Sequence, residues 1–335
     1  MKTAYLIKPG KIEILEKPVP SPEEGEVLVR IVAALTCGTD LKAYLRGHSL
    51  IPMPGPFGHE FSGVIETTGK NVEKFKAGDE VMLVHTAPCG ECEYCRKKLF
   101  NLCKVLTQDM MLGAFSEYII VKKRVVKHNM FIKPPNISFE EAAFLEPLSC
   151  VVHGLKALNH KKDDRVLIIG TGPIGLLFLQ VLRLKEARVA VMGRNTYKLS
   201  LARALGADEI YTTNENPLIF TNGLGFDFVI ECTGHKEVWL NSVNYVRKGG
   251  TVLLFGGLKA KTEVCYDAGK LHYDEITLKG VFHYNPEDVK EAQELIKSGK
   301  LKLKELISGN FPLSEISQAF DKLSRGEGIK YLIKP

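Results

Sequence analysis

The chain has 335 residues, of which 45% are hydrophobic and 25% are charged, and this composition suits a globular protein of two domains. Its net charge of +6 comes from Lys and Arg residues spread along the whole chain, which argues against nucleic-acid binding. The sequence has no apolar run of the roughly 18 residues that a transmembrane helix needs. Its first residues lack the apolar core of a signal peptide, so we expect a cytoplasmic protein that contacts no membrane.

Residues 1–149 predict a mainly β domain interrupted by Gly and Pro. Three segments have the pattern of strands followed by turns: EVLVRIVAALTCGTD, FSGVIETTG and AGDEVMLV. Residues 285–335 predict a helix, a strand, a second helix and a final strand, without another nucleotide-binding motif. We expect this C-terminal tail to fold back onto residues 1–149 and to belong to the same domain.

Four cysteines are concentrated in the segment PCGECEYCRKKLFNLC: Cys89, Cys92, Cys95 and Cys103. In a reducing compartment, cysteines at such short spacings favour thiolate ligands over disulfides. Four sulfurs complete the tetrahedral shell of a zinc ion and leave no open position for a substrate. We therefore predict a structural zinc site; the alternative, a redox cluster, does not explain why the four cysteines lie together.

Residues 150–284 predict a doubly wound parallel sheet of the Rossmann type, an α/β domain that binds a dinucleotide. Six strand-like segments alternate with helical ones: RVLIIG, RVAVMG, ADEIYTT, FDFVIECTG, TVLLFGG and EITLKGVF. The first is followed by G-x-G-x-x-G and then by a buried helix, which is the context that gives this motif its specificity. The predicted phosphate-binding residues are Gly170, Gly172, Pro173, Ile174 and Gly175.

The end of the second strand of this domain predicts which nucleotide binds. Chains that bind NAD usually place Asp or Glu there, about 20 residues beyond the glycines. Here the position holds Gly193, followed by Arg194, whose planar guanidinium suits a 2′-phosphate, and Lys198 adds charge one helical turn later. The sequence therefore favours NADP; the alternative is that Arg194 stacks on the adenine and NAD is accepted.

Taken in order, several motifs make the chain resemble the zinc-containing medium-chain dehydrogenases, and within them the polyol (sorbitol) dehydrogenase branch. The resemblance covers essentially the whole chain. Its motifs are CGTD at 37–40, GHEFSGV at 58–64, the four-cysteine loop, EPLSCVVHG from Glu146, GTGPIG at 170–175 and KGVFHY ending at Tyr284. This resemblance implies that residues 1–149 form a GroES-like catalytic domain.

The resemblance also implies a second, catalytic zinc in addition to the structural one. Its implied ligands are Cys37, His59, Glu60 and Glu146, and either glutamate could coordinate at different stages of turnover. Three protein ligands of mixed sulfur, nitrogen and oxygen type would leave a position open for water or an alcohol. The implied reaction transfers a hydride from the carbinol carbon to nicotinamide, and Thr39 relays the proton of the substrate hydroxyl.

Two positions depart from the family pattern. Many relatives carry a relay histidine where this chain has Lys42, which could act as a base only if its pKa were depressed. The alternative is a solvated lysine, with water carrying the proton. Polyol dehydrogenases also tend to have arginine at the position of His283, which leaves the substrate open. The substrate pocket is predicted to involve Tyr44, Phe57, His283 and Tyr284.

Three functions follow from these motifs. The first is zinc-dependent, NADP-preferring oxidation of a secondary alcohol in a polyol, a sugar alcohol or its phosphate. The second is another zinc dehydrogenase activity, such as that of L-threonine 3-dehydrogenase or a simple alcohol dehydrogenase or ketone reductase. The third is a non-enzymatic NADP-binding regulator, against which the complete set of open-site ligands argues. The family resemblance further implies a homodimer or homotetramer.

Overall fold

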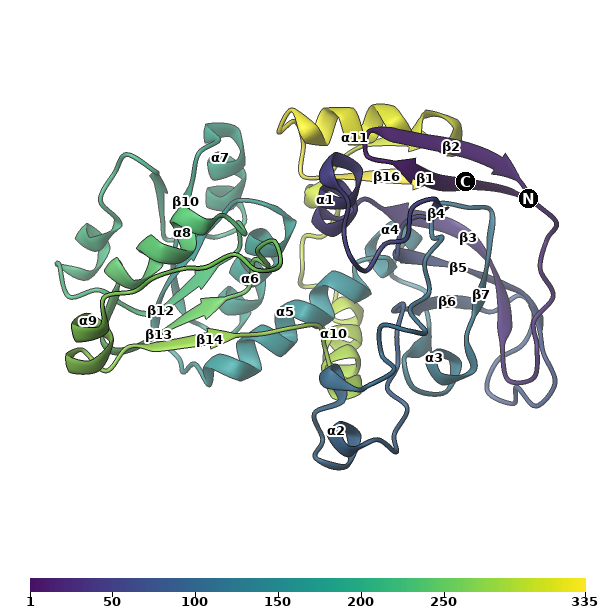
Figure 1. Ribbon diagram of the computed structural model, residues 1–335, viewed down its shortest axis with the longest axis horizontal. Coiled ribbons are helices and arrows are strands. Elements are labelled where there is room, and N and C mark those ends of the chain that lie inside the picture. Colours follow the sequence, from purple (N-terminus) through teal and green to yellow (C-terminus); the bar gives the residue numbers. More distant parts are fainter. The chain divides into compact units, whose positions relative to one another are not determined.

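The computed structural model describes all 335 residues and divides them into two compact units (Figure 1). The first unit comprises Met1–Ser149 and Tyr284–Pro335, and the second comprises Cys150–His283. The sequence had placed the second boundary one residue later, after Tyr284. None of the helices is both long and apolar enough to cross a membrane.

The first unit is built on a mainly antiparallel sheet with the strand order β15-β16-β3-β5-β6-β8, in which β7 also pairs with β3. The strands are β3 (Val27–Leu35), β5 (Glu60–Thr68), β6 (Glu80–Leu83), β7 (Tyr118–Val121), β8 (Met130–Ile132), β15 (Ile307–Pro312) and β16 (Lys330–Lys334). A smaller sheet joins β1 (Lys2–Lys8), β2 (Lys11–Glu16) and β4 (Gly55–Pro56). Because β16 pairs antiparallel with β3, the C-terminal tail folds back onto the N-terminal part of the chain.

Short helices connect and cover these strands. They are α1 (Gly38–Arg46), α2 (Glu93–Arg96), α3 (Lys123–His128), α4 (Phe139–Ala142), α10 (Pro286–Lys297) and α11 (Ile316–Ser324). The tail therefore has the predicted order of helix, strand, helix and strand, in α10, β15, α11 and β16. Helix α5 (Leu145–Leu158) begins in the first unit and continues into the second.

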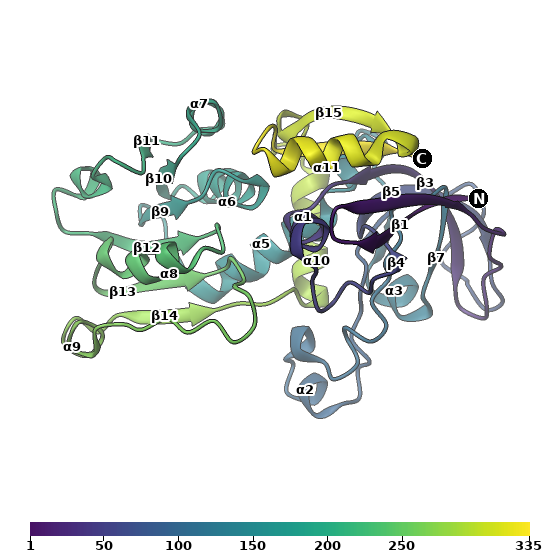
Figure 2. The same ribbon diagram turned by 45° about the horizontal axis from the view of Figure 1, so that its top comes forward.

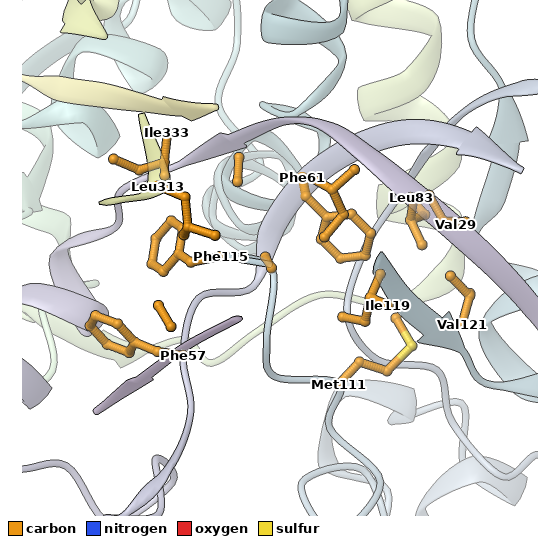
Figure 3. Close-up of a cluster of buried hydrophobic side chains, with 14 of the residues drawn as sticks. Val29, Phe57, Phe61, Leu83, Met111, Phe115, Ile119, Val121, Leu313 and Ile333 are labelled. Carbon is orange, nitrogen blue, oxygen red and sulfur yellow. The ribbon is translucent and has the colours of Figure 1, made fainter. Parts of the chain in front are cut away.

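An aromatic cluster forms the centre of the first unit's core (Figure 3). The ring of Phe57 lies 5.4 Å from that of Phe115 and 5.0 Å from that of Phe320, and all three side chains are fully buried. Each such ring pair adds about 0.5–1.5 kcal/mol beyond the area that it buries. Phe57 thus anchors the backbone two residues before His59, which links core packing to the position of a predicted zinc ligand.

The second unit contains a six-stranded parallel sheet with the order β11-β10-β9-β12-β13-β14, which is the doubly wound order predicted from the sequence (Figure 2). Its strands are β9 (Arg165–Ile169), β10 (Arg188–Gly193), β11 (Glu209–Thr212), β12 (Phe226–Glu231), β13 (Val246–Leu254) and β14 (Thr277–Gly280). Its helices after α5 are α6 (Pro173–Leu184), α7 (Thr196–Ala204), α8 (Lys236–Asn241) and α9 (Ala268–Tyr273). The chain adds strands in one direction from β9 to β11 and in the opposite direction from β12 to β14. The switch point therefore lies between β9 and β12, and folds of this kind bind their ligands there.

Candidate metal centres and cofactor site

The four cysteines of the loop at 89–103 converge and form no disulfide. Their Sγ atoms are 3.9 Å apart for Cys89 and Cys95, 3.6 Å for Cys92 and Cys95, and 3.5 Å for Cys89 and Cys103. Sulfurs bound at about 2.3 Å to one tetrahedral zinc ion lie roughly 3.8 Å from one another. The cluster therefore fits zinc, and its spacing is too long for an S–S bond of about 2.05 Å.

The thiols of this cluster differ in their protonation when no cation is present. Backbone N–H groups, first that of Lys104, lower the pKa of Cys92 to about 6. Burial raises the pKa of Cys95 to about 12. Holding both as thiolates at neutral pH requires a positive charge between them, which a zinc ion supplies.

A second set of metal ligands is assembled from separate segments of the first unit. One ligand atom each of Cys37, His59 and Glu60 lies within 4.8 Å of the others. Cys37 is the N-cap of α1, where its Sγ accepts the N–H of Thr39 at 3.4 Å. Burial raises the pKa of the Cys37 thiol in the metal-free chain, while the charge of His59 opposes that rise. A cation is thus needed here too for the sulfur to serve as a thiolate ligand.

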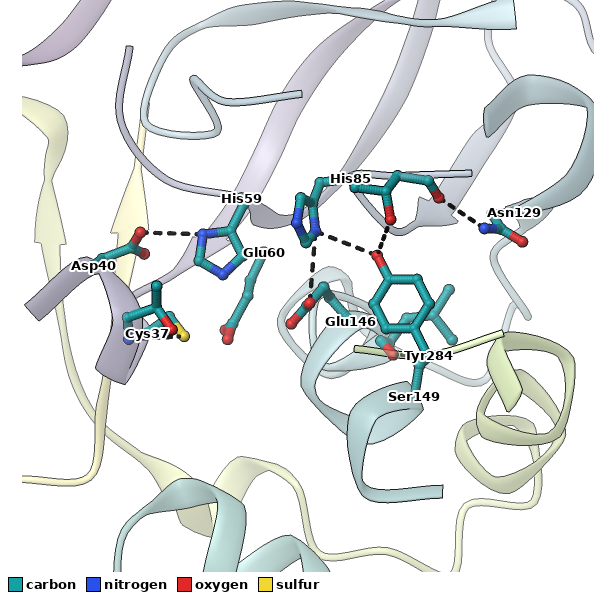
Figure 4. Close-up of polar contacts among 12 residues, drawn as sticks. Cys37, Asp40, His59, Glu60, His85, Asn129, Glu146, Ser149 and Tyr284 are labelled. Carbon is teal, nitrogen blue, oxygen red and sulfur yellow. Dashed lines mark hydrogen bonds and ion pairs between the residues drawn. The ribbon is translucent and has the colours of Figure 1, made fainter. Parts of the chain in front are cut away.

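His59 owes its position to the glycine before it and to an aspartate opposite. Gly58 has φ +88, and a Cβ there would lie 2.6 Å from the Phe115 ring, so the backbone approaches the core where only glycine fits. Asp40 Oδ1 lies 3.1 Å from His59 Nδ1 (Figure 4). Burial opposes the charged imidazole, but Asp40 and Cys37 outweigh it and raise the pKa of His59 well above its ordinary value. A carboxylate on Nδ1 leaves Nε2 as the nitrogen for a metal.

Glu60 is buried beside a buried lysine that the sequence did not reveal. Lys330 Nζ on β16 lies 2.5 Å from Glu60 Oε2 and also donates to the Thr36 carbonyl at 2.7 Å. Burial raises the pKa of Glu60, and Lys330 counteracts that rise. The other oxygen, Oε1, has no hydrogen-bond partner although it is buried. An unpartnered buried carboxylate oxygen is the group that a metal ion would satisfy.

Glu146, in the first turn of α5, faces His85, which is not among the residues that the sequence predicts for the site. Its Oε1 lies 3.5 Å from His85 Nδ1, and the Tyr284 hydroxyl lies 3.3 Å from the same nitrogen (Figure 4). The Tyr284 hydroxyl also lies 3.0 Å from Thr86 Oγ1. Burial raises the pKa of Glu146 to about 7. These contacts form a buried polar chain behind the carboxylate, and the His59 and His85 rings have their centroids 4.8 Å apart.

The remaining predicted residues of the first unit differ in accessibility. Thr39 and Lys42 lie half-buried on α1, where Lys42 still makes polar contacts within the chain. Tyr44 is tied to the core because its hydroxyl donates to Asp321 at 2.8 Å, with its pKa raised to about 12 by burial. A substrate role for Tyr44 or Phe57 stays a prediction, and their burial favours packing. In the second unit, His283 has φ 63 and stacks against Phe282.

The glycine motif of the second unit has the shape that a dinucleotide requires. Gly170, directly after β9, has φ +121, and α6 begins immediately after its N-cap Gly172, with Pro173 and Ile174 in its first turn. A Cβ at Gly172 would meet nothing within 4 Å, whereas one at Gly175 would lie 2.0 Å from the Gly170 carbonyl oxygen. The space beside Gly172 is open for a phosphate, and the absence of a side chain at Gly175 lets the helix pack on the strand. The residues present therefore fit a dinucleotide cofactor.

The end of β10 carries no carboxylate. Gly193 is its last residue and is buried, Arg194 is exposed, and Lys198 is half-buried on α7. Asn195 caps α7 by accepting the Lys198 N–H at 3.1 Å. Burial lowers the pKa of the Lys198 ammonium. The surroundings of a bound ribose here would thus be basic, with nothing acidic at position 193.

Two family models match the chain in the regions that carry these sites. The alcohol dehydrogenase GroES-like domain matches residues 23–130, and the zinc-binding dehydrogenase model matches residues 173–298. A GroES-like unit with an open mixed-ligand metal set, joined to a Rossmann unit, defines a zinc-dependent alcohol dehydrogenase of the medium-chain class. The chain belongs to this family, on its polyol dehydrogenase-like branch, and is an NAD(P)-dependent alcohol oxidoreductase.

Curated relatives match along nearly the full length. D-arabitol-phosphate dehydrogenase of Enterococcus avium is 32% identical, over 100% of this chain and 97% of its own. Sorbitol dehydrogenase of Halalkalibacterium halodurans is 31% identical, over 97% of this chain and 96% of its own. L-threonine 3-dehydrogenase of Bacillus velezensis is also 31% identical, over 96% of this chain and 94% of its own.

Solved structures have the same fold throughout. Galactitol-1-phosphate dehydrogenase from Escherichia coli superposes with a TM-score of 0.90 at 27% identity, over 100% of both chains. A protein described as a zinc-binding dehydrogenase from Sinorhizobium meliloti, solved with NADP bound, has a TM-score of 0.89 at 29% identity and covers 100% of this chain and 99% of its own.

Proposed function

We propose that this protein is a two-zinc, NADP-preferring dehydrogenase that oxidises a secondary alcohol of a polyol, a sugar alcohol or its phosphate. The observation that carries the proposal is the set of half-buried Cys37 with buried His59 and Glu60, in which one carboxylate oxygen of Glu60 lacks a partner. A purely structural site would be closed by four protein ligands. A site with mixed ligands and an open position can accept an alcohol oxygen.

The residues of the open site have different roles, which follow from their positions. A bound zinc supplies Lewis acidity, which lowers the pKa of a coordinated hydroxyl. Asp40 orients His59, and Lys330 holds one oxygen of Glu60, so both ligands are fixed before substrate arrives. Thr39, half-buried on α1, takes the hydroxyl proton and passes it on, with Lys42 or water as the next acceptor. The glycine-rich turn of the second unit would hold the nicotinamide cofactor, which would supply the hydride acceptor.

NADP preference rests on Gly193, Arg194 and Lys198. With no carboxylate at position 193, a 2′-phosphate meets no repulsion, and the exposed Arg194 guanidinium offers a planar pair of donors. The NADP bound in the Sinorhizobium meliloti structure supports this choice. The proposed substrates include phosphorylated polyols because D-arabitol-phosphate dehydrogenase and galactitol-1-phosphate dehydrogenase are both similar to this protein along its full chain.

A second candidate is L-threonine 3-dehydrogenase activity, because a protein of that name is 31% identical over 96% of this chain. It uses the same metal and cofactor and differs in the substrate, a hydroxy amino acid. Neither candidate requires a particular assembly, and we expect a homodimer or homotetramer, which light scattering after size-exclusion chromatography would measure.

The test is a substrate panel with the zinc-loaded enzyme. Sorbitol, arabitol, their phosphates, galactitol 1-phosphate, 2,3-butanediol and L-threonine are each assayed with NADP and with NAD. The proposal expects the highest kcat/KM for a polyol or polyol phosphate with NADP. Highest activity with L-threonine would favour the second candidate, and activity with none of these would contradict both.

A further inference from the structure

A side chain of the glycine-rich turn lies against the strand end that selects the nucleotide. Gly193 ends β10, and the neighbouring residue Met192 pairs with Ile169 of β9. The Gly170 N–H donates to the Met192 carbonyl at 2.8 Å, which clamps the turn after β9 onto the end of β10. Thr171, the next residue of the turn, is consequently brought beside Gly193 and is only 7% exposed.

Thr171 fills the space that a side chain at position 193 would need. A Cβ built on Gly193 would lie 2.8 Å from Thr171 Cγ2, 2.9 Å from its Oγ1 and 3.4 Å from its Cβ. Non-bonded carbon atoms prefer separations of about 3.5–4.0 Å. Both branches of the threonine therefore overlap with the position of a Cβ, while the threonine Cβ itself is in ordinary contact.

Rotation of the Thr171 side chain does not remove this overlap. A β-branched side chain carries heavy atoms on two of its three staggered positions. In the structure, the methyl group and the hydroxyl of Thr171 occupy the two staggered positions that face Gly193, and the Cβ hydrogen occupies the third. Rotating χ1 to another staggered position places this hydrogen at only one of the two facing positions. One heavy atom always stays close, so a residue larger than glycine at 193 must displace the backbone or the threonine.

This packing bears directly on the choice of nucleotide. The carboxylate that binds the ribose hydroxyls of NAD occupies the position of Gly193 in chains of this fold. We propose that Thr171 is a specificity-determining residue for the cofactor: it excludes an acidic side chain at position 193 and so keeps this site open to a 2′-phosphate. The inference rests on the proposed preference for NADP, but its steric part can be measured independently.

The experiment is a double-mutant cycle in the full-length, zinc-loaded protein. The variants are Thr171→Ala, Gly193→Asp and the pair together, with Gly193→Ala and Thr171→Ala/Gly193→Ala as an uncharged second cycle. For each, the melting temperature is measured without nucleotide, and Kd for NADP and for NAD is measured by fluorescence titration. Alanine at 171 keeps only the Cβ, whose distance of 3.4 Å from a Cβ at 193 is tolerable.

The inference predicts strong coupling between the two positions. Gly193→Asp and Gly193→Ala alone should each lower the melting temperature by roughly 3–8 °C, as overpacking does, and adding Thr171→Ala should restore most of that loss. Gly193→Asp alone should weaken NADP binding about 10-fold or more through like-charge repulsion and overpacking without strengthening NAD binding. The double variant should bind NAD about 10-fold more tightly than Gly193→Asp alone.

Two results would overturn the inference. One is additivity of the changes in melting temperature in the alanine cycle. The alanine variants bury no charge, so this cycle can be measured even if Gly193→Asp does not fold. The other is NAD binding by Gly193→Asp that is as tight as binding by the double variant. Equal affinity of the wild-type enzyme for NAD and NADP would instead contradict the cofactor preference under Proposed function, and the alanine cycle would still decide whether Thr171 excludes side chains at 193.

Discussion

The two metal clusters of the first unit are built in opposite ways. The four-cysteine cluster takes all its ligands from one loop, residues 89–103, and each ligand is a sulfur. The open cluster takes Cys37 from the start of α1 and His59 and Glu60 from the start of β5, with Lys330 on β16 behind Glu60. Glu146 on α5 lies beside His85 outside this group, and its role as a further ligand stays a prediction. A closed set of like ligands serves folding, whereas an open mixed set depends on the whole unit for its geometry and serves chemistry.

The largest expected effect is a loss of catalysis without a loss of stability when a ligand of the open cluster is replaced. Cys37→Ser should lower kcat/KM about 1,000-fold or more, because a metal Lewis acid supplies several kcal/mol of transition-state stabilisation. The melting temperature should change little, because Cys37 is half-buried outside the hydrophobic core. Steady-state kinetics and calorimetry measure both. Cys265→Ser, at an exposed thiol, is the matched control, and more than a tenth of wild-type activity in Cys37→Ser would refute the assignment.

The next effect concerns the ion pair behind the open cluster. Lys330→Met leaves the Glu60 carboxylate buried without its cation and should lower the free energy of unfolding by about 3–5 kcal/mol. Lys330→Met/Glu60→Gln should recover part of that loss, because no uncompensated charge remains. Urea unfolding measures each value. The exposed pair of Lys97 and Glu93, at 3.0 Å, provides the control, since Lys97→Met should change stability by about 1 kcal/mol or less.

A pH-dependent effect should distinguish the open cluster once its zinc has been removed. Burial raises the pKa of Glu146 from 4.5 to about 7, so the folded chain holds this proton more tightly than the unfolded chain does. Stability is thus retained at low pH and is lost as pH rises from about 4.5 to about 7. Glu146→Gln carries no such charge and should stabilise the metal-free protein by about 3 kcal/mol at pH 8. A difference at pH 8 no greater than that at pH 4.5 would contradict this.

The smallest effect tests the polar chain behind Glu146. His85→Asn removes the imidazole that contacts the carboxylate and should weaken metal affinity or activity about 10- to 100-fold, as loss of an outer partner does. With Co²⁺ in the open site, its visible absorption spectrum should shift in His85→Asn and not in His128→Asn, at an exposed histidine. Tyr284→Phe should have a weaker effect of the same kind. An unchanged cobalt spectrum in His85→Asn would mean that His85 does not position Glu146.

The sequence predicted most reliably what is local. The cysteine loop, the G-x-G-x-x-G turn and the six strands of the second unit are each contained in short segments whose spacing dictates their structure. Asp40 could have been found in the same way, because it lies three residues after Cys37, on the first turn of α1.

The contacts that the sequence did not predict join distant segments. Lys330 and Glu60 are 270 residues apart, and a lysine within the apolar run KYLIK is the sole local hint that a buried partner exists. His85, just after β6, meets Glu146 on α5 and Tyr284 at the start of the first unit's C-terminal segment, and no spacing rule encodes this packing. The overlap of Thr171 with position 193 likewise requires the register of β9 and β10.

Zinc content measured by mass spectrometry during chelation of the native enzyme tests the contrast between the two clusters most directly. We expect two zinc ions per chain, of which one leaves first, together with all dehydrogenase activity, while the fold is retained. It further predicts that Cys37→Ser binds one zinc, which resists the chelator. A single zinc ion per wild-type chain, or two that leave together as the protein unfolds, would contradict the account.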